Sequence, residues 1–170
     1  LQNAPLIMWG HSAGGQFNYE FVCWKPERVI AFVVNKGGIY YTAMAPNETR
    51  KVPAVLFIGE NDLEARNDII KGLFSMNRRA GALWIYAPEP EVDHEIGLSK
   101  SFSIAFFNDI IPLRLSVNGS INSLSLANGW LGDHKNKCIA PFSDLGKFKY
   151  PVSWLPTKNI SEVWLKFITK

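Results

Sequence analysis

The feature that most constrains the fold is the stretch at residues 5–15, PLIMWGHSAGG, where an apolar run ends in a serine between glycines. The run at residues 5–9 is short, continuously apolar and followed by glycine, which predicts a buried strand. Over residues 13–24 the apolar residues recur every three or four positions, which predicts a helix. Its apolar face would comprise Ala13, Phe17, Phe21 and Trp24. Ser12 therefore occupies a tight turn from strand to helix.

Further along the chain, apolar runs alternate with helical periodicity. Strands are predicted at residues 29–34, 54–58 and 82–87. A helix is predicted after the strand at residues 54–58, with one face formed by Ala65, Ile69, Leu73, Met76 and Ala80. Another helix is predicted over residues 97–111, with one face formed by Leu98, Phe102, Phe106 and Ile110. Strands that are apolar throughout and joined by helices predict an α/β fold with a parallel sheet.

The tail of the chain has a different composition. Residues 116–157 are rich in Ser, Asn, Gly and Lys, which predicts an irregular wrap around the domain formed by residues 1–115. A last short helix is predicted at residues 160–168, with Asn159 and Glu162 resembling a capping box at its start. We expect the tail to belong to the same domain.

Composition argues against several classes of function. The net charge of the 170 residues is only +3, and the basic residues are scattered, so no nucleic-acid partner is expected. No apolar run reaches the roughly 20 residues of a membrane-spanning helix, so no membrane partner is expected either. Cys23, Cys138 and the three histidines follow no metal-ligand spacing, and neither a metal nor another cofactor is expected.

The pentapeptide GHSAG, residues 10–14, has the G-x-S-x-G pattern of a nucleophile elbow between a strand and a helix. Such a turn forces strained backbone angles on the serine, and Gly10 and Gly14 would avoid collisions between its two arms. Ser12 would then be the nucleophile, and the backbone N–H of Ala13 at the helix N-terminus would stabilise an oxyanion. The alternative is a glycine-rich turn with an ordinary serine.

A serine nucleophile needs a base, and the chain has three histidines. His94 follows the fourth predicted strand, at the carboxyl edge of the sheet where Ser12 also emerges, and is the preferred base. His11 lies inside the elbow, where its side chain points away from Ser12. His134 lies in the tail and remains the alternative, because the tail could fold over the site.

The base in turn needs an acid that orients it. Asp62 lies three residues after Gly59, at the carboxyl end of the third predicted strand. It is the preferred acid, and its alternative role is that of a helix N-cap. Competing carboxylates are Glu60, Glu64, Asp68 and Asp93.

Candidates for lining a substrate pocket follow only from topology. Tyr40 and Tyr41 come after the second predicted strand, at the edge where ligands bind in parallel sheets. His11 borders the nucleophile, and Trp130 could fold over the site from the tail. Each of these side chains could equally have a packing role.

The order Ser12, Asp62, His94, in the motifs GHSAGG, VLFIGENDLEAR and DHEIG, resembles the C-terminal half of an α/β-hydrolase domain. Within that superfamily the chain is most similar to dienelactone hydrolases and acetyl-xylan or feruloyl esterases. The resemblance implies a serine esterase that acts through an acyl-enzyme on a small-molecule or carbohydrate-linked ester. Alternatives are a peptidase or acyltransferase on the same three residues, and a non-catalytic relative.

The resemblance also implies a partial fold that lacks its N-terminal strands, because the family's nucleophile strand follows several earlier strands of the sheet. We therefore expect the missing N-terminal half of the same protein to be a partner of residues 1–170. The second oxyanion donor of the family lies in that half, so residues 1–170 alone are expected to be inactive.

Overall fold

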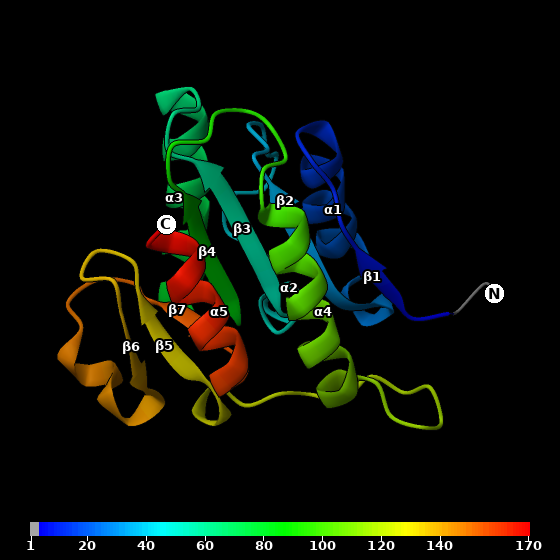
Figure 1. Ribbon diagram of the computed structural model, residues 1–170. Coiled ribbons are helices and arrows are strands. Elements are labelled where there is room, and N and C mark those ends of the chain that lie inside the picture. The colour runs from blue at the N-terminus through cyan, green and yellow to red at the C-terminus, as the bar shows by residue number, and fades with distance from the viewer. Residues whose placement is uncertain (1–3) are drawn as a thin grey trace.

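A parallel four-stranded sheet, in the order β1-β2-β3-β4, organises the computed structural model, which describes residues 4–170 (Figure 1). The strands are β1 (Leu6–Met8), β2 (Val29–Asn35), β3 (Ala54–Gly59) and β4 (Trp84–Glu89). Each neighbouring pair is parallel, and β2, β3 and β4 are buried along their whole length. The prediction of an α/β fold with a parallel sheet and helical crossovers is confirmed.

Helices cover both faces of this sheet. They are α1 (Ala13–Trp24), α2 (Asn47–Arg50), α3 (Glu64–Arg79), α4 (Ser99–Arg114) and α5 (Lys158–Ile168). Side chains of α1 and α3 pack on one face in a first hydrophobic cluster, and those of α4 and α5 pack on the other face in a second. Figure 1 shows α4 and α5 side by side on the near side of the sheet.

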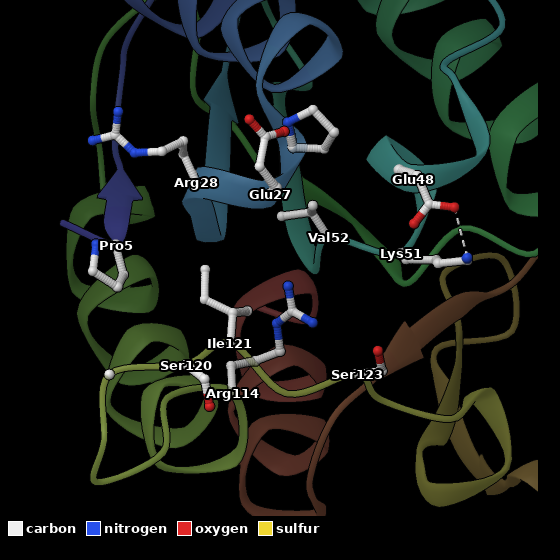
Figure 2. A pocket seen from close by; sticks show the side chains of 12 residues that line it. Pro5, Glu27, Arg28, Glu48, Lys51, Val52, Arg114, Ser120, Ile121 and Ser123 are labelled. Carbon is white, nitrogen blue, oxygen red and sulfur yellow. Dashed lines mark hydrogen bonds and ion pairs between the residues drawn. The ribbon is translucent and has the colours of Figure 1, made fainter. Parts of the chain in front are cut away.

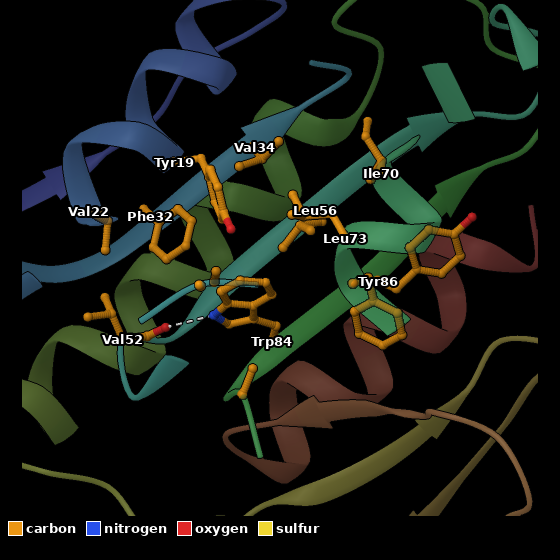
Figure 3. Close-up of a cluster of buried hydrophobic side chains, with 14 of the residues drawn as sticks. Tyr19, Val22, Phe32, Val34, Val52, Leu56, Ile70, Leu73, Trp84 and Tyr86 are labelled. Carbon is orange, nitrogen blue, oxygen red and sulfur yellow. Dashed lines mark hydrogen bonds between the residues drawn. The ribbon is translucent and has the colours of Figure 1, made fainter. Parts of the chain in front are cut away.

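Aromatic rings fill the centre of the first cluster (Figure 3). The indole of Trp84 meets the rings of Phe32 and Tyr19 edge-on, at centroid distances of 6.0 and 6.1 Å. Its N–H donates a hydrogen bond to the backbone oxygen of Val52, at 3.2 Å. The buried indole thus packs β4 against β2 and α1, and its N–H has a hydrogen-bond acceptor.

The predicted apolar face of α1 is wrong. Phe17 and Trp24 are 63% and 71% exposed, and the buried side chains are Asn18, Tyr19 and Val22. At Gly15 the helix lies so close to β2 that a Cβ would be 3.0 Å from the Asn35 nitrogen, and the Asn18 amide donates to the Val33 backbone oxygen at 3.0 Å. Close approach, rather than apolar spacing, selects the buried face.

The predicted face of α3 is confirmed at Leu73 but is otherwise wrong by about one position around the helix. Ile69 and Met76 are 44% and 42% exposed, whereas Ile70 is fully buried. The buried face includes Asn77 and Arg78, whose side chains donate to the backbone oxygens of loops that pack on the helix. The spacing of apolar residues does not predict a buried face that consists partly of polar residues.

The tail is more regular than expected, although it also contains long segments without strands or α-helices. It forms a second, antiparallel sheet in the order β6-β5-β7, which lies beyond β4. Its strands are β5 (Trp130–Asp133), β6 (Cys138–Pro141) and β7 (Ser153–Leu155). The Ser153 hydroxyl joins it to β4 by accepting from the Tyr86 N–H at 2.9 Å. Strands this short leave only a weak alternation pattern in the sequence.

The expected capping box of α5 is also absent. The N-cap is Thr157, whose hydroxyl accepts from the Ile160 N–H at 3.0 Å. Asn159 instead donates to the carboxylate of Asp109 on α4, at 3.0 Å. Threonine is itself a favourable N-cap, so the helix begins two residues earlier than predicted.

Two adjacent isoleucines test the face that α3 buries. Ile70→Ala is expected to lower the free energy of unfolding by about 2–5 kcal/mol, because it opens a cavity in the first cluster. Ile69→Ala, the matched control, is expected to change it by no more than about 0.5 kcal/mol, because that side chain is half-exposed. Urea unfolding of both variants measures this, and equal losses would contradict the assignment.

Candidate active site

The turn between β1 and α1 holds Ser12 in a strained backbone conformation. Its φ is 53° and its ψ is −121°, in a region that residues other than glycine rarely adopt. The Ser12 N–H donates to the Asn35 backbone oxygen at 2.8 Å, and the Asn35 N–H donates to the Gly10 oxygen at 3.0 Å. These two bonds to the end of β2 hold the turn in place against that strain.

Two glycines make this turn possible, and only one of them, Gly10, was predicted. A Cβ at Gly10 would lie 2.2 Å from the Gly14 backbone oxygen, so glycine is required there. A Cβ at Gly14 would meet nothing within 4 Å, so the predicted need for glycine at that position is wrong. Gly15 is the second constrained position, because its Cβ would lie 3.0 Å from the Asn35 nitrogen.

The N-terminus of α1 offers one free donor beside Ser12. Ala13 is the first residue of the helix and is exposed. Among the backbone hydrogen bonds of residues 4–170, none is donated by the Ala13 N–H. This N–H lies where the helix dipole favours negative charge.

Asp62 lies in a turn directly after β3. Its N–H donates to the Gly59 oxygen at 3.0 Å, and the neighbouring Asn61 N–H donates to the Val92 oxygen at 3.0 Å. A Cβ at Gly59 would lie 2.2 Å from the Asp93 backbone oxygen, so only glycine permits this approach. The end of β3 is therefore packed against residues 90–98, which we call the His94 loop.

The His94 loop brings an imidazole between the serine and the aspartate. His94 Nε2 lies 2.9 Å from Ser12 Oγ, and His94 Nδ1 lies 2.9 Å from Asp62 Oδ2. The hydroxyl of Ser12 can donate to Nε2 while Nδ1–H donates to the carboxylate. Three side chains from the ends of β1, β3 and β4 thus form one continuous chain of hydrogen bonds.

The surroundings of Asp62 favour its ionised form. Burial by itself raises the pKa of this carboxyl, but three interactions outweigh it and lower the pKa below its usual value. Nδ1–H of His94 donates to one oxygen, and the Leu63 N–H and the Arg66 guanidinium donate to the other. The N-cap of α3 is Leu63 rather than Asp62, so the carboxylate is not used as the cap.

The other two histidines have different surroundings. The His11 ring lies 4.9 Å from the His94 ring, and its Nε2–H donates to the His94 backbone oxygen at 3.0 Å. Burial and the adjacent His94 lower the pKa of His11. His134 packs edge-on against Tyr86 of β4 at 4.9 Å, whereas Ser12 follows β1 at the opposite edge of the sheet.

Of the predicted pocket residues, His11 lies beside His94, whereas Tyr40 and Trp130 pack on the two hydrophobic clusters. Tyr40 packs against Tyr19 in the first cluster, with ring centroids 5.2 Å apart. Tyr41 is 91% exposed. Trp130 packs on the second cluster beyond β4, so the expectation that it covers the site is wrong. The tail folds into its own sheet at that edge, and this keeps Trp130 away from the end of β1.

A cavity of about 440 Å³ lies at the opposite end of the sheet, where the strands begin (Figure 2). Its lining includes Glu27 and Arg28 before β2, Val52 before β3, and Arg114 at the end of α4. The Arg114 guanidinium already donates to the backbone oxygens of Ile30 and Asn122. Ser12, His94 and Asp62 lie at the other end of the sheet, and none of them lines this cavity.

Within residues 4–170, no three His, Cys, Asp or Glu side chains are grouped so that they could hold a metal ion. None of the helices in that part of the chain combines the length and the apolar character needed to cross a membrane.

Sequence reasoning missed a buried ion pair beside this site, between Lys36 and Glu89. Both residues are charged and come directly at the carboxyl ends of continuously apolar strands. Ligands bind at the carboxyl edge of a parallel sheet. A charged residue at the carboxyl end of an apolar strand is therefore the sequence signal that could have pointed to Lys36 and Glu89.

Comparisons with known proteins find only a partial likeness. No protein-family model and no curated protein matches the chain. The crystal structure of SOBER1 from Arabidopsis thaliana is similar to 58% of this chain and 49% of that chain, at 23% identity and a TM-score of 0.46. A Klebsiella pneumoniae protein assigned as a dienelactone hydrolase is similar over 56% and 42%, at 19% identity and a TM-score of 0.43.

This chain therefore spans about half the length of the solved structures that it matches. At these identities the likeness concerns the fold alone.

Two glycine substitutions test the turn. Gly10→Ala is expected to lower the melting temperature strongly, because its Cβ would collide with the Gly14 backbone. Gly14→Ala is expected to leave the melting temperature unchanged or raise it slightly, because alanine favours a helix over glycine by about 1 kcal/mol. Thermal unfolding of both variants measures the difference, and a Gly14→Ala variant as unstable as Gly10→Ala would contradict the geometry.

The lowered pKa of Asp62 predicts a dependence of stability on pH. Its contribution is fully present above the pKa of an unfolded aspartate, about 3.9. It is lost as the pH falls through the lower pKa of the folded state. The difference in unfolding free energy between wild type and Asp62→Asn should therefore shrink below about pH 4. Urea unfolding at several pH values measures it, and a difference that stays constant down to pH 2 would contradict the assignment.

Proposed function

We propose that this chain carries the nucleophile, base and acid of a serine hydrolase, with Ser12, His94 and Asp62 in those roles. One observation carries the proposal: the hydrogen-bonded chain from Ser12 Oγ through both ring nitrogens of His94 to Asp62, with both contacts at 2.9 Å. A hydroxyl, an imidazole and a buried carboxylate in that order are what nucleophilic acyl transfer requires.

The first chemical step is attack on an acyl carbon. His94 Nε2 takes the proton from Ser12 Oγ as the oxygen bonds to the substrate carbonyl carbon. Asp62 is ionised and hydrogen-bonded to Nδ1–H, so it stabilises the imidazolium that forms and holds the ring in the required orientation. The free Ala13 N–H, at the helix N-terminus, is the donor that we assign to the developing oxyanion.

The second half of the reaction reverses these roles. The protonated His94 gives its proton to the leaving oxygen, and an acyl-enzyme remains on Ser12. Water then attacks the acyl carbon while His94 accepts its proton. The bond between Ser12 Oγ and the acyl carbon breaks as His94 returns this proton to Oγ, which releases the acid. The strained turn supports this role, because it projects the hydroxyl and leaves the Ser12 side chain only partly buried.

A carboxylic ester is the substrate class that we propose. The support is the resemblance of GHSAGG, VLFIGENDLEAR and DHEIG, in this order, to dienelactone hydrolases and to acetyl-xylan or feruloyl esterases. Small-molecule and carbohydrate-linked esters both fall within that class.

The experiment is labelling of the full-length protein with a fluorophosphonate probe, together with hydrolysis of p-nitrophenyl acetate. Wild type is expected to carry the label on Ser12, and Ser12→Ala to carry none. His94→Ala is expected to lower turnover by about 10⁴-fold or more, since the oxyanion donor and substrate binding alone remain.

His134→Ala is the matched control, because it removes the same side chain at the other edge of the sheet. Its turnover is expected to stay within about threefold of wild type, which corresponds to a change below about 1 kcal/mol in the activation free energy. Folded wild type that takes up no label would refute the nucleophile. Labelled wild type that does not hydrolyse esters would refute only the ester class, and would favour a peptidase or acyltransferase.

A further inference from the structure

A buried ion pair lies directly under the His94 loop and takes no part in the chemistry proposed above. Lys36 Nζ lies 2.9 Å from Glu89 Oε2, and the two side chains are 0% and 2% exposed. Lys36 follows β2 and Glu89 ends β4, so β3 lies between the two strands. A buried ion pair is expensive to desolvate, and an apolar pair of the same size would often be as stable.

Both charged groups bind the backbone of the His94 loop. The Lys36 ammonium donates to the Glu95 oxygen at 2.6 Å, one residue after His94. The other carboxylate oxygen of Glu89 accepts from the Leu98 N–H at 2.5 Å. Gly97 has a φ of 54°, and a Cβ there would lie 2.3 Å from Glu89 Oε1, so the loop is fitted closely around the carboxylate.

The backbone of Lys36 is itself unusual. Its φ is 54°, in the left-handed region that a lysine rarely adopts. This conformation follows directly after Asn35, whose backbone holds the Ser12 turn through two hydrogen bonds. Strain of this kind persists where the surrounding structure needs it, and such positions cluster at functional sites.

We propose that Lys36 and Glu89 are a positioning pair for His94: they fix the backbone of the His94 loop so that Nε2 stays in line with the Ser12 hydroxyl. This inference rests on the proposed function of Ser12 and His94. The pair touches neither substrate nor reacting atoms, and it acts through the Glu95 oxygen and the Leu98 N–H. A displacement of about 1 Å at the imidazole can cost on the order of 10²-fold in rate.

The test variant is Lys36→Met/Glu89→Gln, which removes both charges while nearly preserving volume. Replacing a whole buried pair is commonly tolerated by the fold, so the melting temperature is expected to stay close to that of wild type. The hydrogen bond to the Glu95 oxygen is lost. The rate of labelling of Ser12 by the fluorophosphonate, and kcat for p-nitrophenyl acetate, are therefore expected to fall by about 10²-fold with little change in KM.

Arg78→Met is the matched control. Arg78 is also a buried cation that donates to a backbone oxygen, that of Val152 at 2.9 Å, but it lies far from the His94 loop along α3. Its loss is expected to lower stability and to leave the labelling rate per folded molecule unchanged. A labelling rate that falls equally in both variants would show a general effect of destabilisation and overturn the positioning role.

Glu89→Gln alone provides a second, independent measurement if the double variant does not fold. Its amide oxygen can still accept from the Leu98 N–H, and Lys36 Nζ can still donate to the Glu95 oxygen. Because both hydrogen bonds survive, the labelling rate is expected to stay within about threefold of wild type. A loss near 10²-fold would overturn the proposal.

Amide hydrogen exchange separates this proposal from the proposed function. In the double variant, residues 90–98 are expected to exchange faster while β2, β3 and β4 are unchanged. If wild type takes up no label, the proposed function fails. The hydrogen-exchange measurement then still tests whether Lys36 and Glu89 hold the His94 loop. Unchanged exchange in residues 90–98, or labelling of the double variant at the wild-type rate, would refute the positioning pair.

Discussion

The close approach of the Ser12 turn to the end of β2 determines the arrangement of this whole edge of the sheet. Two backbone hydrogen bonds join the turn to Asn35, and Gly15 lets α1 come within contact distance of the same residue. Phe17 and Trp24 of the same helix are exposed, whereas Tyr19 is buried in the first cluster. The approach also places Lys36, the residue after Asn35, under the His94 loop.

The sheet and the identity of the three side chains could be predicted from the sequence because both follow from local patterns. Continuous apolar runs mark strands that are buried on both faces, and the ends of those strands must lie at one edge. Ser12, Asp62 and His94 each follow such a run within a few residues. Their mutual hydrogen bonds then require only that three loops meet at that edge, as they do here.

What could not be predicted depends on contacts between distant residues. Phe17 and Ile69 are apolar at helical spacing, yet both are exposed, because backbone approach and buried polar groups select the inner faces of α1 and α3. Gly14 looks essential from its place in the motif, but open space surrounds it, and Gly15 carries the steric role. Lys36 also breaks the usual rule that charge is exposed, because its partner Glu89 lies 53 residues away.

The position of His94 is a property of the whole sheet, because every strand contributes a hydrogen bond to its loop. His11 after β1 binds the His94 oxygen, and Lys36 after β2 binds the Glu95 oxygen. Asn61 after β3 and Glu89 at the end of β4 bind the two ends of the loop. A shift of any one strand would therefore move a contact of the loop that carries the imidazole. A loop without regular secondary structure thereby acquires the rigidity that the general-base role proposed for His94 requires.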